Sequence, residues 1–200
     1  MTELQDILDV NEVLRKYAAS LRDRFGPGKR FLLVQSPQFL FETINPEVVR
    51  NRGYYAYPPT GLQRLAESLS GRDIEVQIFD LNLHVLQRIA QEGRLDSEKW
   101  LEALDKQLDT FRPTIVGVTC LTVYTDLFAT NHPLTSILRH VTARGEQMVV
   151  IGGPTAINEM DRYLKEGLCH FAVEGEGEDR LNYLLDIYED RYDASEPVSG

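Results

Sequence analysis

The chain has 200 residues, of which 42% are hydrophobic and 26% are charged. This length and balance are typical of one globular domain with a short appended segment, and they exclude wholesale disorder and a fibrous architecture. The formal net charge of −10 provides no basic field for phosphate groups, so nucleic acids and anionic membranes are poor partners. The sequence has no apolar run long enough for a membrane-spanning helix and no signal-peptide pattern at its amino terminus, which predicts a cytoplasmic protein.

The two cysteines, Cys120 and Cys169, both lie in apolar, strand-like runs. In a reducing compartment such cysteines are expected to be buried thiols rather than disulfide partners. The sequence has no CxxC pattern and no histidine-rich cluster, so a protein-built zinc site is not predicted.

The chain begins with a helical pattern and continues as alternating strands and helices. Residues 4–25 have a helical period that is interrupted once near residues 9–11, and Gly26-Pro27-Gly28 ends it. Short apolar runs predict strands at residues 30–35, 74–80, 114–119, 148–151 and 169–173. Helical patterns occupy residues 61–69, 97–111, 127–142, 159–166 and 179–188.

This alternation is typical of βαβ units, whose right-handed crossovers build a doubly wound parallel sheet with helices on both faces. Five strands at this length favour the flavodoxin-like (Rossmann-like) α/β class with strand order 2-1-3-4-5. We expect three parts: an amino-terminal helical extension at residues 1–28, the α/β domain at 29–192, and a polar tail or linker at 193–200.

Ligands of such sheets bind at the carboxyl edge, so the residues after each strand are candidates for a site. A long loop after the first strand carries aromatic residues at 54–57, which could cover a flat ligand or pack on the sheet edge. After the third strand, the hydroxyls of Thr119 and Thr122 could bond a polar ligand arm. Thr122 or Thr125 could instead cap the next helix.

The fourth and fifth strands end in glycine-rich segments. Gly152-Gly153 removes two Cβ atoms, which permits a close approach to the backbone or a tight turn, and Pro154 removes an N–H that a phosphate cradle would use. The segment 173–178, VEGEGE, has too many carboxylates for a dinucleotide fingerprint. Glu178 and Asp179 are also suited to the positive end of the following helix.

Together these strand ends resemble the cobalamin-binding domain found at the amino end of cobalamin-dependent radical S-adenosylmethionine enzymes. The segments that carry the resemblance occur in the order of that family, between about residue 31 and residue 188. They are YPPTGLQRLA at 57–66, EVQIFD at 75–80, VGVT at 116–119, VIGGP at 150–154 and VEGEGE at 173–178.

The resemblance implies a corrinoid ring over the carboxyl edge and a dimethylbenzimidazole tail between the sheet and the helices. It implies ten cofactor-binding residues: Thr119, Leu121 and Thr122 lining the tail cleft, Gly152, Gly153 and Pro154 beside the nucleotide loop, and Val173, Glu174, Gly175 and Glu176 on the far side.

Two departures refine what the resemblance implies. Cobalamin domains of the methionine-synthase and mutase type carry D-x-H-x-x-G after the first strand, whereas residues 36–41 contain no histidine. We therefore expect base-off cobalamin without a protein histidine ligand to cobalt, and His84, the first histidine in the chain, is interpreted as a surface or loop residue.

The second departure concerns catalysis. Two cysteines 49 positions apart cannot form the C-x-x-x-C-x-x-C motif that holds the iron–sulfur cluster of a radical enzyme. We expect no complete catalytic site in this chain, which is interpreted as a fragment or a free-standing module. The cluster and S-adenosylmethionine would belong to a radical domain in the same or a partner chain.

The leading hypothesis is a cobalamin-binding module that serves methyl transfer or a related radical reaction. The alternative is a flavodoxin-like interaction domain that binds no corrinoid and uses loop 54–57 and the amino-terminal helix as contact surfaces. A phosphoacceptor receiver domain would need aspartates where Gln35-Ser36 and Thr119-Cys120 stand. Flavin binding has only the analogy of fold in its favour.

Overall fold

The computed structural model describes residues 2–51, 57–96, 99–119, 121, 128, 131–154 and 159–191, with the backbone alone for residues 2–10. Its centre is a five-stranded parallel sheet in the order β2-β1-β3-β4-β5, as predicted. The strands are β1 (Arg30–Gln35), β2 (Glu75–Asp80), β3 (Ile115–Thr119), β4 (Met148–Gly152) and β5 (Phe171–Val173). The predicted tail, residues 193–200, lies outside the described residues.

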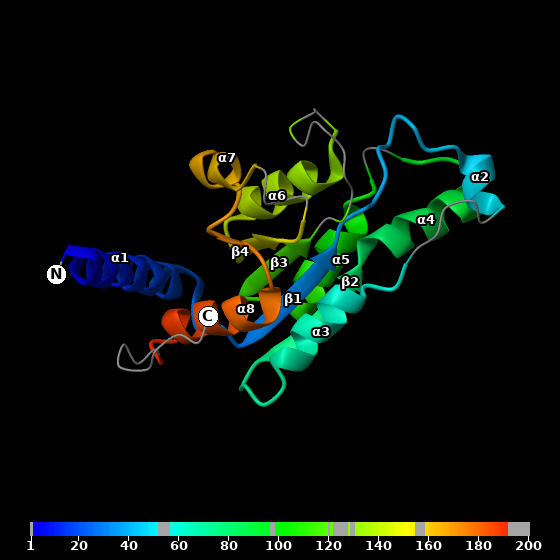
Figure 1. The fold of residues 1–200 in the computed structure, drawn as a ribbon. Coiled ribbons are helices and arrows are strands. Elements are labelled where there is room, and N and C mark those ends of the chain that lie inside the picture. Colours follow the sequence, from blue (N-terminus) through cyan, green and yellow to red (C-terminus); the bar gives the residue numbers. More distant parts are fainter. Residues whose placement is uncertain are drawn as a thin grey trace.

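Helices cover both faces of the sheet (Figure 1). They are α1 (Thr2–Phe25), α2 (Pro46–Arg50), α3 (Thr60–Ser68), α4 (Leu81–Glu92), α5 (Glu102–Phe111), α6 (Pro133–Arg144), α7 (Met160–Lys165) and α8 (Gly177–Tyr188). Apolar residues of α4, α5 and α6 form one core with the sheet, and those of α1, α3 and α8 form the other. In the described part of the chain, no helix has the length and apolar character needed to cross a membrane.

The two cores explain why the strands are almost continuously apolar. Side chains alternate between the faces of a strand, so Leu32 and Val34 enter the core with α4, α5 and α6. Phe31 and Leu33 enter the core with α1, α3 and α8. Since helices cover both faces, neither set of positions can be polar.

Helix α1 is continuous from Thr2 to Phe25, so the predicted interruption near residues 9–11 is wrong. The backbone continues the helix through this polar stretch because neither Gly nor Pro occurs there to stop it. The predicted end is confirmed, since Gly26 has a φ of +85° and takes the chain out of the helix.

Helix α4 was not predicted, and His84 lies in its first turn, partly exposed at the surface, so of the two predicted placements the loop is wrong. The Asp80 side chain caps the helix by accepting a hydrogen bond from the Leu83 N–H at 2.9 Å. The His84 ring is partly buried, with its centroid 6.0 Å from that of Phe79. The short helix α2 was also missed, and α5 and α6 begin later than predicted, at Glu102 and Pro133.

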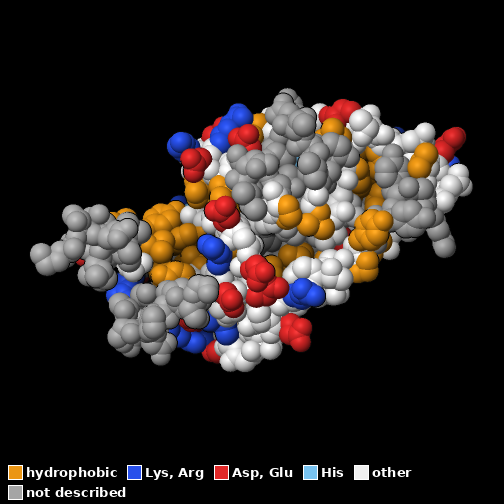
Figure 2. All heavy atoms as spheres, viewed as in Figure 1, with side chains coloured by type: hydrophobic (Ala, Val, Ile, Leu, Met, Phe, Trp, Pro, Cys, Tyr) orange, Lys and Arg blue, Asp and Glu red, His pale blue; other side chains and the backbone are white. Residues whose placement is uncertain are grey.

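Helix α1 joins the domain through its carboxyl-terminal half, where Ala18, Leu21 and Phe25 are buried. Nearer its amino end, Val13 is 67% exposed and Tyr17 is 42% exposed. Figure 2 shows hydrophobic side chains gathered where α1 meets the body of the molecule. This part of α1 is therefore an exposed apolar surface beside the sheet.

His170, just before β5, connects the sheet to α1. Its Nδ1 atom accepts a hydrogen bond from the Val149 N–H at 2.9 Å, and its ring contacts that of Phe25 edge to face. Burial lowers the pKa of His170, and the nearby Arg24 guanidinium adds to this effect. The folded chain therefore favours the neutral imidazole.

We expect the free energy of unfolding to fall as the pH drops from about 7 to about 5.5, because the unfolded chain protonates His170 near pH 6.5 while the folded chain resists it. Above that range both states are neutral and the stabilisation is complete. His170→Asn should reduce the slope, since a carboxamide oxygen can accept the Val149 N–H without titrating. Urea unfolding across this pH range measures the free energy of unfolding and its dependence on pH.

His84 also contributes to the expected dependence of stability on pH. Burial lowers its pKa too, so a residual slope should persist in the His170→Asn variant. An unchanged slope in that variant would show that His170 does not couple protonation to folding.

Candidate functional site

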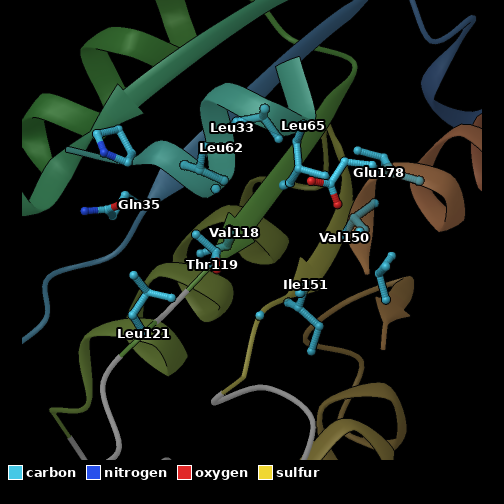
Figure 3. Close-up of a pocket in the computed structure, with 18 of the residues that line it drawn as sticks. Leu33, Gln35, Leu62, Leu65, Val118, Thr119, Leu121, Val150, Ile151 and Glu178 are labelled. Atoms are coloured by element: carbon cyan, nitrogen blue, oxygen red, sulfur yellow. The ribbon is translucent and has the colours of Figure 1, made fainter. Parts of the chain in front are cut away.

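A cleft of about 400 Å³ opens at the carboxyl edge of the sheet, between β1, β3, β4 and β5 on one side and α3 and α8 on the other (Figure 3). The lining residues used below are Phe31, Leu33, Gln35, Thr60, Leu62, Leu65, Gly117, Thr119, Leu121, Val150, Gly152, Gly153, Pro154, Val173, Gly175, Gly177, Glu178 and Leu181. This volume lies within the range of small-molecule and cofactor sites.

The sheet forms the floor of the cleft. Strand pairing places the floor residues in two rows across the sheet. The outer row, at the carboxyl ends of the strands, pairs Gln35 with Thr119, Thr119 with Gly152, and Gly152 with Val173. The inner row, two residues further into the sheet, pairs Leu33 with Gly117 and Gly117 with Val150. Residues two apart on a strand face the same way, so both rows face the cleft.

Helices α3 and α8 form the opposite wall. Leu62 and Leu65 of α3 and Leu181 of α8 contribute apolar side chains to it. The two helices lie close together where α8 begins: a Cβ atom on Gly177 would lie 2.9 Å from Cδ2 of Leu65. Glycine at position 177 therefore permits this approach between two segments distant in sequence.

Two glycines of the floor have different roles, since Gly117 makes room for the Phe31 ring and Gly152 borders the cleft. A Cβ on Gly117 would lie 2.9 Å from Cε2 of buried Phe31, so a larger residue would displace the packed ring. A Cβ on Gly152 would make ordinary contact, 3.6 Å from the Val173 carbonyl oxygen, and a longer side chain there would extend into the cleft. Gly153 has a φ of +97°, a conformation that suits glycine.

The electrostatic character of the cleft is weak and slightly acidic. Glu178, in the first turn of α8, contributes the one charged side chain among the described residues that line it. Its carboxylate points into the cleft in Figure 3. No histidine occurs among the described lining residues, and nowhere in the described part of the chain do three or more His, Cys, Asp or Glu side chains gather as a metal site.

Of the ten residues predicted from the resemblance, seven line this cleft: Thr119, Leu121, Gly152, Gly153, Pro154, Val173 and Gly175. Glu174 and Glu176 lie in the loop between β5 and α8 but are exposed and do not line it. Thr122 lies outside the described residues, as do Thr125, Cys120 and the aromatic residues at 54 and 55. That these residues bind a cofactor stays a prediction.

Several lining residues were not predicted as a site. Gly117 could have been noticed as a lone glycine in a β-branched strand, a sign of close approach. The sequence does not mark Leu65 and Leu181 as lining residues, because an apolar position on a helix is normally expected in the hydrophobic core. Cys169 is a free, buried thiol as predicted, and burial raises its pKa to about 12.

A flavodoxin-like sheet with an apolar cleft at its carboxyl edge defines a cofactor-binding α/β domain. The family model described as "B12 binding domain" matches residues 46–185, well over half of the chain. The chain therefore belongs to the B12 binding domain family, and the resemblance inferred from its strand ends is confirmed. No curated protein matches the chain.

Two solved structures are similar in fold, and both are of radical S-adenosylmethionine enzymes. The cobalamin-dependent radical enzyme OxsB, with aqua-cobalamin and S-adenosylmethionine bound, is 13% identical with a TM-score of 0.54, over 84% of this chain and 20% of that one. The methyltransferase TsrM from Kitasatospora setae, with tryptophan and a S-adenosylmethionine analogue, is 22% identical with a TM-score of 0.49, over 83% and 27%. The chain thus spans about a quarter or less of these enzymes.

Proposed function

We propose that the chain holds cobalamin in this cleft and presents it to a radical S-adenosylmethionine domain for methyl transfer or a related radical reaction. The corrinoid ring would lie over the carboxyl edge, with the nucleotide tail between the sheet and helices α3 and α8. The observation that carries the proposal is the cleft itself, whose floor lacks a side chain at Gly152 and whose walls are apolar.

The residues present fit this group. The flat dimethylbenzimidazole base of the tail needs width and apolar contact, which Gly152 and the leucines of α3 and α8 supply. A ligand held mainly by several phosphate groups would need positive charge, whereas Glu178 is acidic and no Lys or Arg is among the described lining residues. When bound, cobalamin supplies the cobalt that carries a methyl group or electrons, and the protein supplies position and environment.

The protein side of this function is binding rather than catalysis. The outer-row groups Gln35 and Thr119 can hydrogen-bond polar atoms of the tail near the mouth. Leu62, Leu65 and Leu181 exclude water from its inner part. No residue of the cleft is assigned a role in moving protons or electrons.

We further propose that the cobalt has no histidine ligand from this chain and that cobalamin is held base-off. Residues 36–41 contain no histidine, and none is among the described residues lining the cleft. The iron–sulfur cluster and S-adenosylmethionine would be held by a radical domain in the same or a partner chain. The likeness in fold to OxsB, a cobalamin-dependent radical enzyme, supports this pairing.

The test is direct reconstitution. Purified chain is incubated with hydroxocobalamin, desalted, and assayed by its absorption spectrum, with about one corrinoid per chain expected. In the reduced cob(II)alamin form, the electron paramagnetic resonance spectrum should lack nitrogen splitting from an axial base. Loss of all corrinoid on desalting, with an intact circular dichroism spectrum, would contradict cobalamin binding. Nitrogen splitting would contradict only the base-off, histidine-free state.

The second candidate is an interaction domain without corrinoid, which the exposed Val13 and Tyr17 on α1 favour. In that case the chain would retain no corrinoid, and substitution of these two residues would weaken capture of a partner. Membership of the B12 binding domain family favours the first proposal.

A further inference from the structure

We propose that Glu178 couples cobalamin binding to the uptake of one proton, which its carboxylate shares with the free ring nitrogen of the lower base. This inference rests on the proposed function and deepens it, since it names a residue that favours the base-off state. The proton comes from the solvent when cobalamin binds and returns there when cobalamin leaves. It serves binding alone, and no step of the reaction uses it.

Glu178 differs from the other residues of the cleft in its charge. It contributes the one charged side chain among the lining residues that the structure describes, and its carboxylate lies among Leu33, Leu65 and Val150 (Figure 3). Leu33 and Val150 belong to the inner row of the floor, and Leu65 belongs to the wall formed by α3. A negative charge therefore faces the space between the sheet and the helices, where the proposed function places the nucleotide tail.

The backbone before Glu178 holds this side chain at a defined point of the wall. Gly175 has a φ of +75°, which suits glycine, and turns the chain from β5 toward α8. Gly177 lies against α3, because a Cβ atom there would be 2.9 Å from Cδ2 of Leu65. The turn and this close contact define where α8 begins, and so they define where the Glu178 side chain enters the cleft.

The dipole of α8 does not by itself explain the direction of this carboxylate. Glu178 and Asp179 both lie in the first turn of the helix, where negative charge is favourable. Asp179 meets that preference from an exposed position, whereas Glu178 is only partly exposed and lines the cleft. Since an exposed carboxylate would serve the dipole equally well, the inward direction of Glu178 indicates a role toward a ligand.

No other titratable side chain faces Glu178 from the described lining of the cleft. The strands β1, β3, β4 and β5 contribute only apolar residues, glycines and the uncharged Gln35 and Thr119. The charged residues of α3, and those beside Glu178 in the sequence, are exposed and do not line the cleft: Arg64, Glu67, Glu174, Glu176, Asp179 and Arg180. A ligand that fills the cleft therefore meets an acidic group without a cation among these lining residues.

A tail that fills the cleft would exclude water from the Glu178 carboxylate. A carboxylate that loses its water without gaining a partner destabilises the complex. The lower base, once released from cobalt, has one ring nitrogen with a free lone pair, and two acceptors that face each other repel. One proton between them forms a strong hydrogen bond whether it resides on the nitrogen or on the carboxyl group.

This pairing favours the base-off state over the base-on state. In base-on cobalamin the ring nitrogen is bonded to cobalt, so it cannot share a proton with Glu178. In the base-off state the same nitrogen is free to accept one. The stabilisation from the shared proton is therefore gained only when the base has left cobalt and entered the cleft.

The experiment titrates the purified chain with methylcobalamin, whose upper methyl group does not titrate, and follows binding by absorption. Because one proton is taken up, we expect the dissociation constant to rise by about tenfold or more between about pH 6 and pH 8. Calorimetry near pH 6 in two buffers of different ionisation enthalpy should show about one proton taken up per cobalamin. A dissociation constant that is the same across this range would overturn the inference and leave cobalamin binding intact.

Glu178→Gln should remove the dependence on pH, because a carboxamide N–H can donate to the neutral ring nitrogen without a proton from the solvent. We expect its dissociation constant to change less than about twofold over the same range. Asp179→Asn is the matched control, since it removes a carboxylate from the same turn of α8 at an exposed position outside the cleft. This control should keep the wild-type dependence. A wild-type dependence in folded Glu178→Gln would overturn the assignment to this residue.

Methylcobinamide, which lacks the nucleotide, tests the ligand's side of the pair. It has no base nitrogen, so its affinity for the chain should not depend on pH. If its affinity depends on pH as that of methylcobalamin does, the proton is not shared with the base, and the inference fails while corrinoid binding stands. If neither corrinoid binds to the folded chain, the proposed function fails and this inference fails with it.

Discussion

Gly152→Leu is expected to abolish retention of cobalamin after desalting, while the chain remains folded. Gly152 lies in the outer row between Thr119 and Val173, at the carboxyl end of β4. A Cβ there makes ordinary contact 3.6 Å from the Val173 carbonyl oxygen, so the remaining carbons of leucine must extend into the cleft. They would occupy the space that the nucleotide tail needs.

A size series sharpens this test. Gly152→Ala should reduce affinity only partly, by about tenfold or less, because one methyl group is accommodated by the existing contact. Gly153 is a poorer position for this test. Its φ of +97° would strain any larger residue, so a loss of cobalamin could come from unfolding rather than from a blocked cleft. Thermal unfolding of each variant separates these effects. Full retention by folded Gly152→Leu would show that the tail does not use this cleft.

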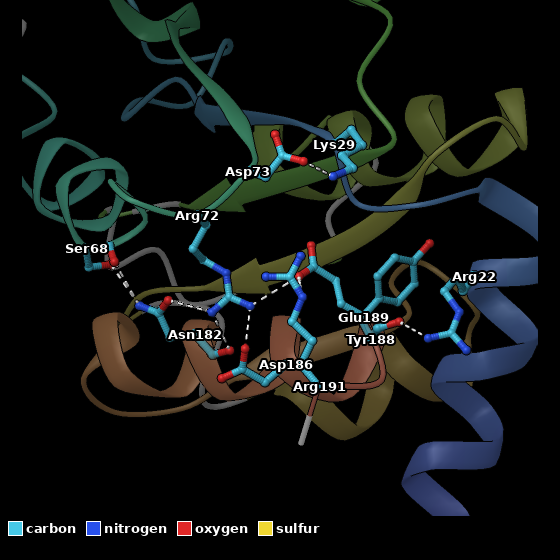
Figure 4. Close-up of polar contacts among 10 residues, drawn as sticks. All are labelled: Arg22, Lys29, Ser68, Arg72, Asp73, Asn182, Asp186, Tyr188, Glu189 and Arg191. Atoms are coloured by element: carbon cyan, nitrogen blue, oxygen red, sulfur yellow. Dashed lines mark hydrogen bonds and ion pairs between the residues drawn. The ribbon is translucent and has the colours of Figure 1, made fainter. Parts of the chain in front are cut away.

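Arg72 fastens the turn after α3 to helix α8 (Figure 4). Its guanidinium donates to the Asn182 side-chain oxygen at 3.0 Å and to the Asp186 carboxylate at 2.5 Å, and it lies 3.4 Å from the Glu189 carboxylate. We call these four residues the Arg72 clasp. The Arg72 side chain is only 14% exposed and that of Glu189 only 9%, whereas the Asp186 side chain, at 39%, reaches the solvent.

Arg72→Ala is expected to lower the free energy of unfolding by about 1–2 kcal/mol, because it removes the cation beside the partly exposed Asp186 carboxylate and leaves the buried Glu189 carboxylate with Arg191 alone. Arg72→Lys should recover only part of this loss, since a single ammonium group cannot replace a two-nitrogen contact. Urea denaturation with circular dichroism measures both. A loss near zero for Arg72→Ala would show that solvent screens the clasp.

Lys16→Ala is the matched control for the loss of a cation. Lys16 forms an ion pair with Glu12 on α1 at 2.6 Å, but both side chains are more than half exposed. Its removal should leave the unfolding curve unchanged, since exposed pairs contribute little. The contrast between the two positions would attribute the stabilisation to burial rather than to ion pairing in general.

Hydrophobic pattern was enough to predict the sheet and its order. Each of the five strands is a short, mainly apolar run, and the alternation with helices admits few topologies. The pattern was insufficient for α4, whose residues follow β2 directly. The side chain of Asp80, the last residue of that strand, caps the new helix, so no loop marked the change.

The sequence by itself also predicted which residues gather at one edge, because the carboxyl ends of parallel strands lie together. Residues as far apart as Thr119, Gly152 and Val173 were expected together for that reason, and pairing across the sheet confirms it. Only the tertiary structure decided what faces them. Leu65 and Gly177 are distant in sequence and meet because α3 and α8 pack on the same face, and an apolar helix position has the same local pattern whether it fills a core or lines a cleft.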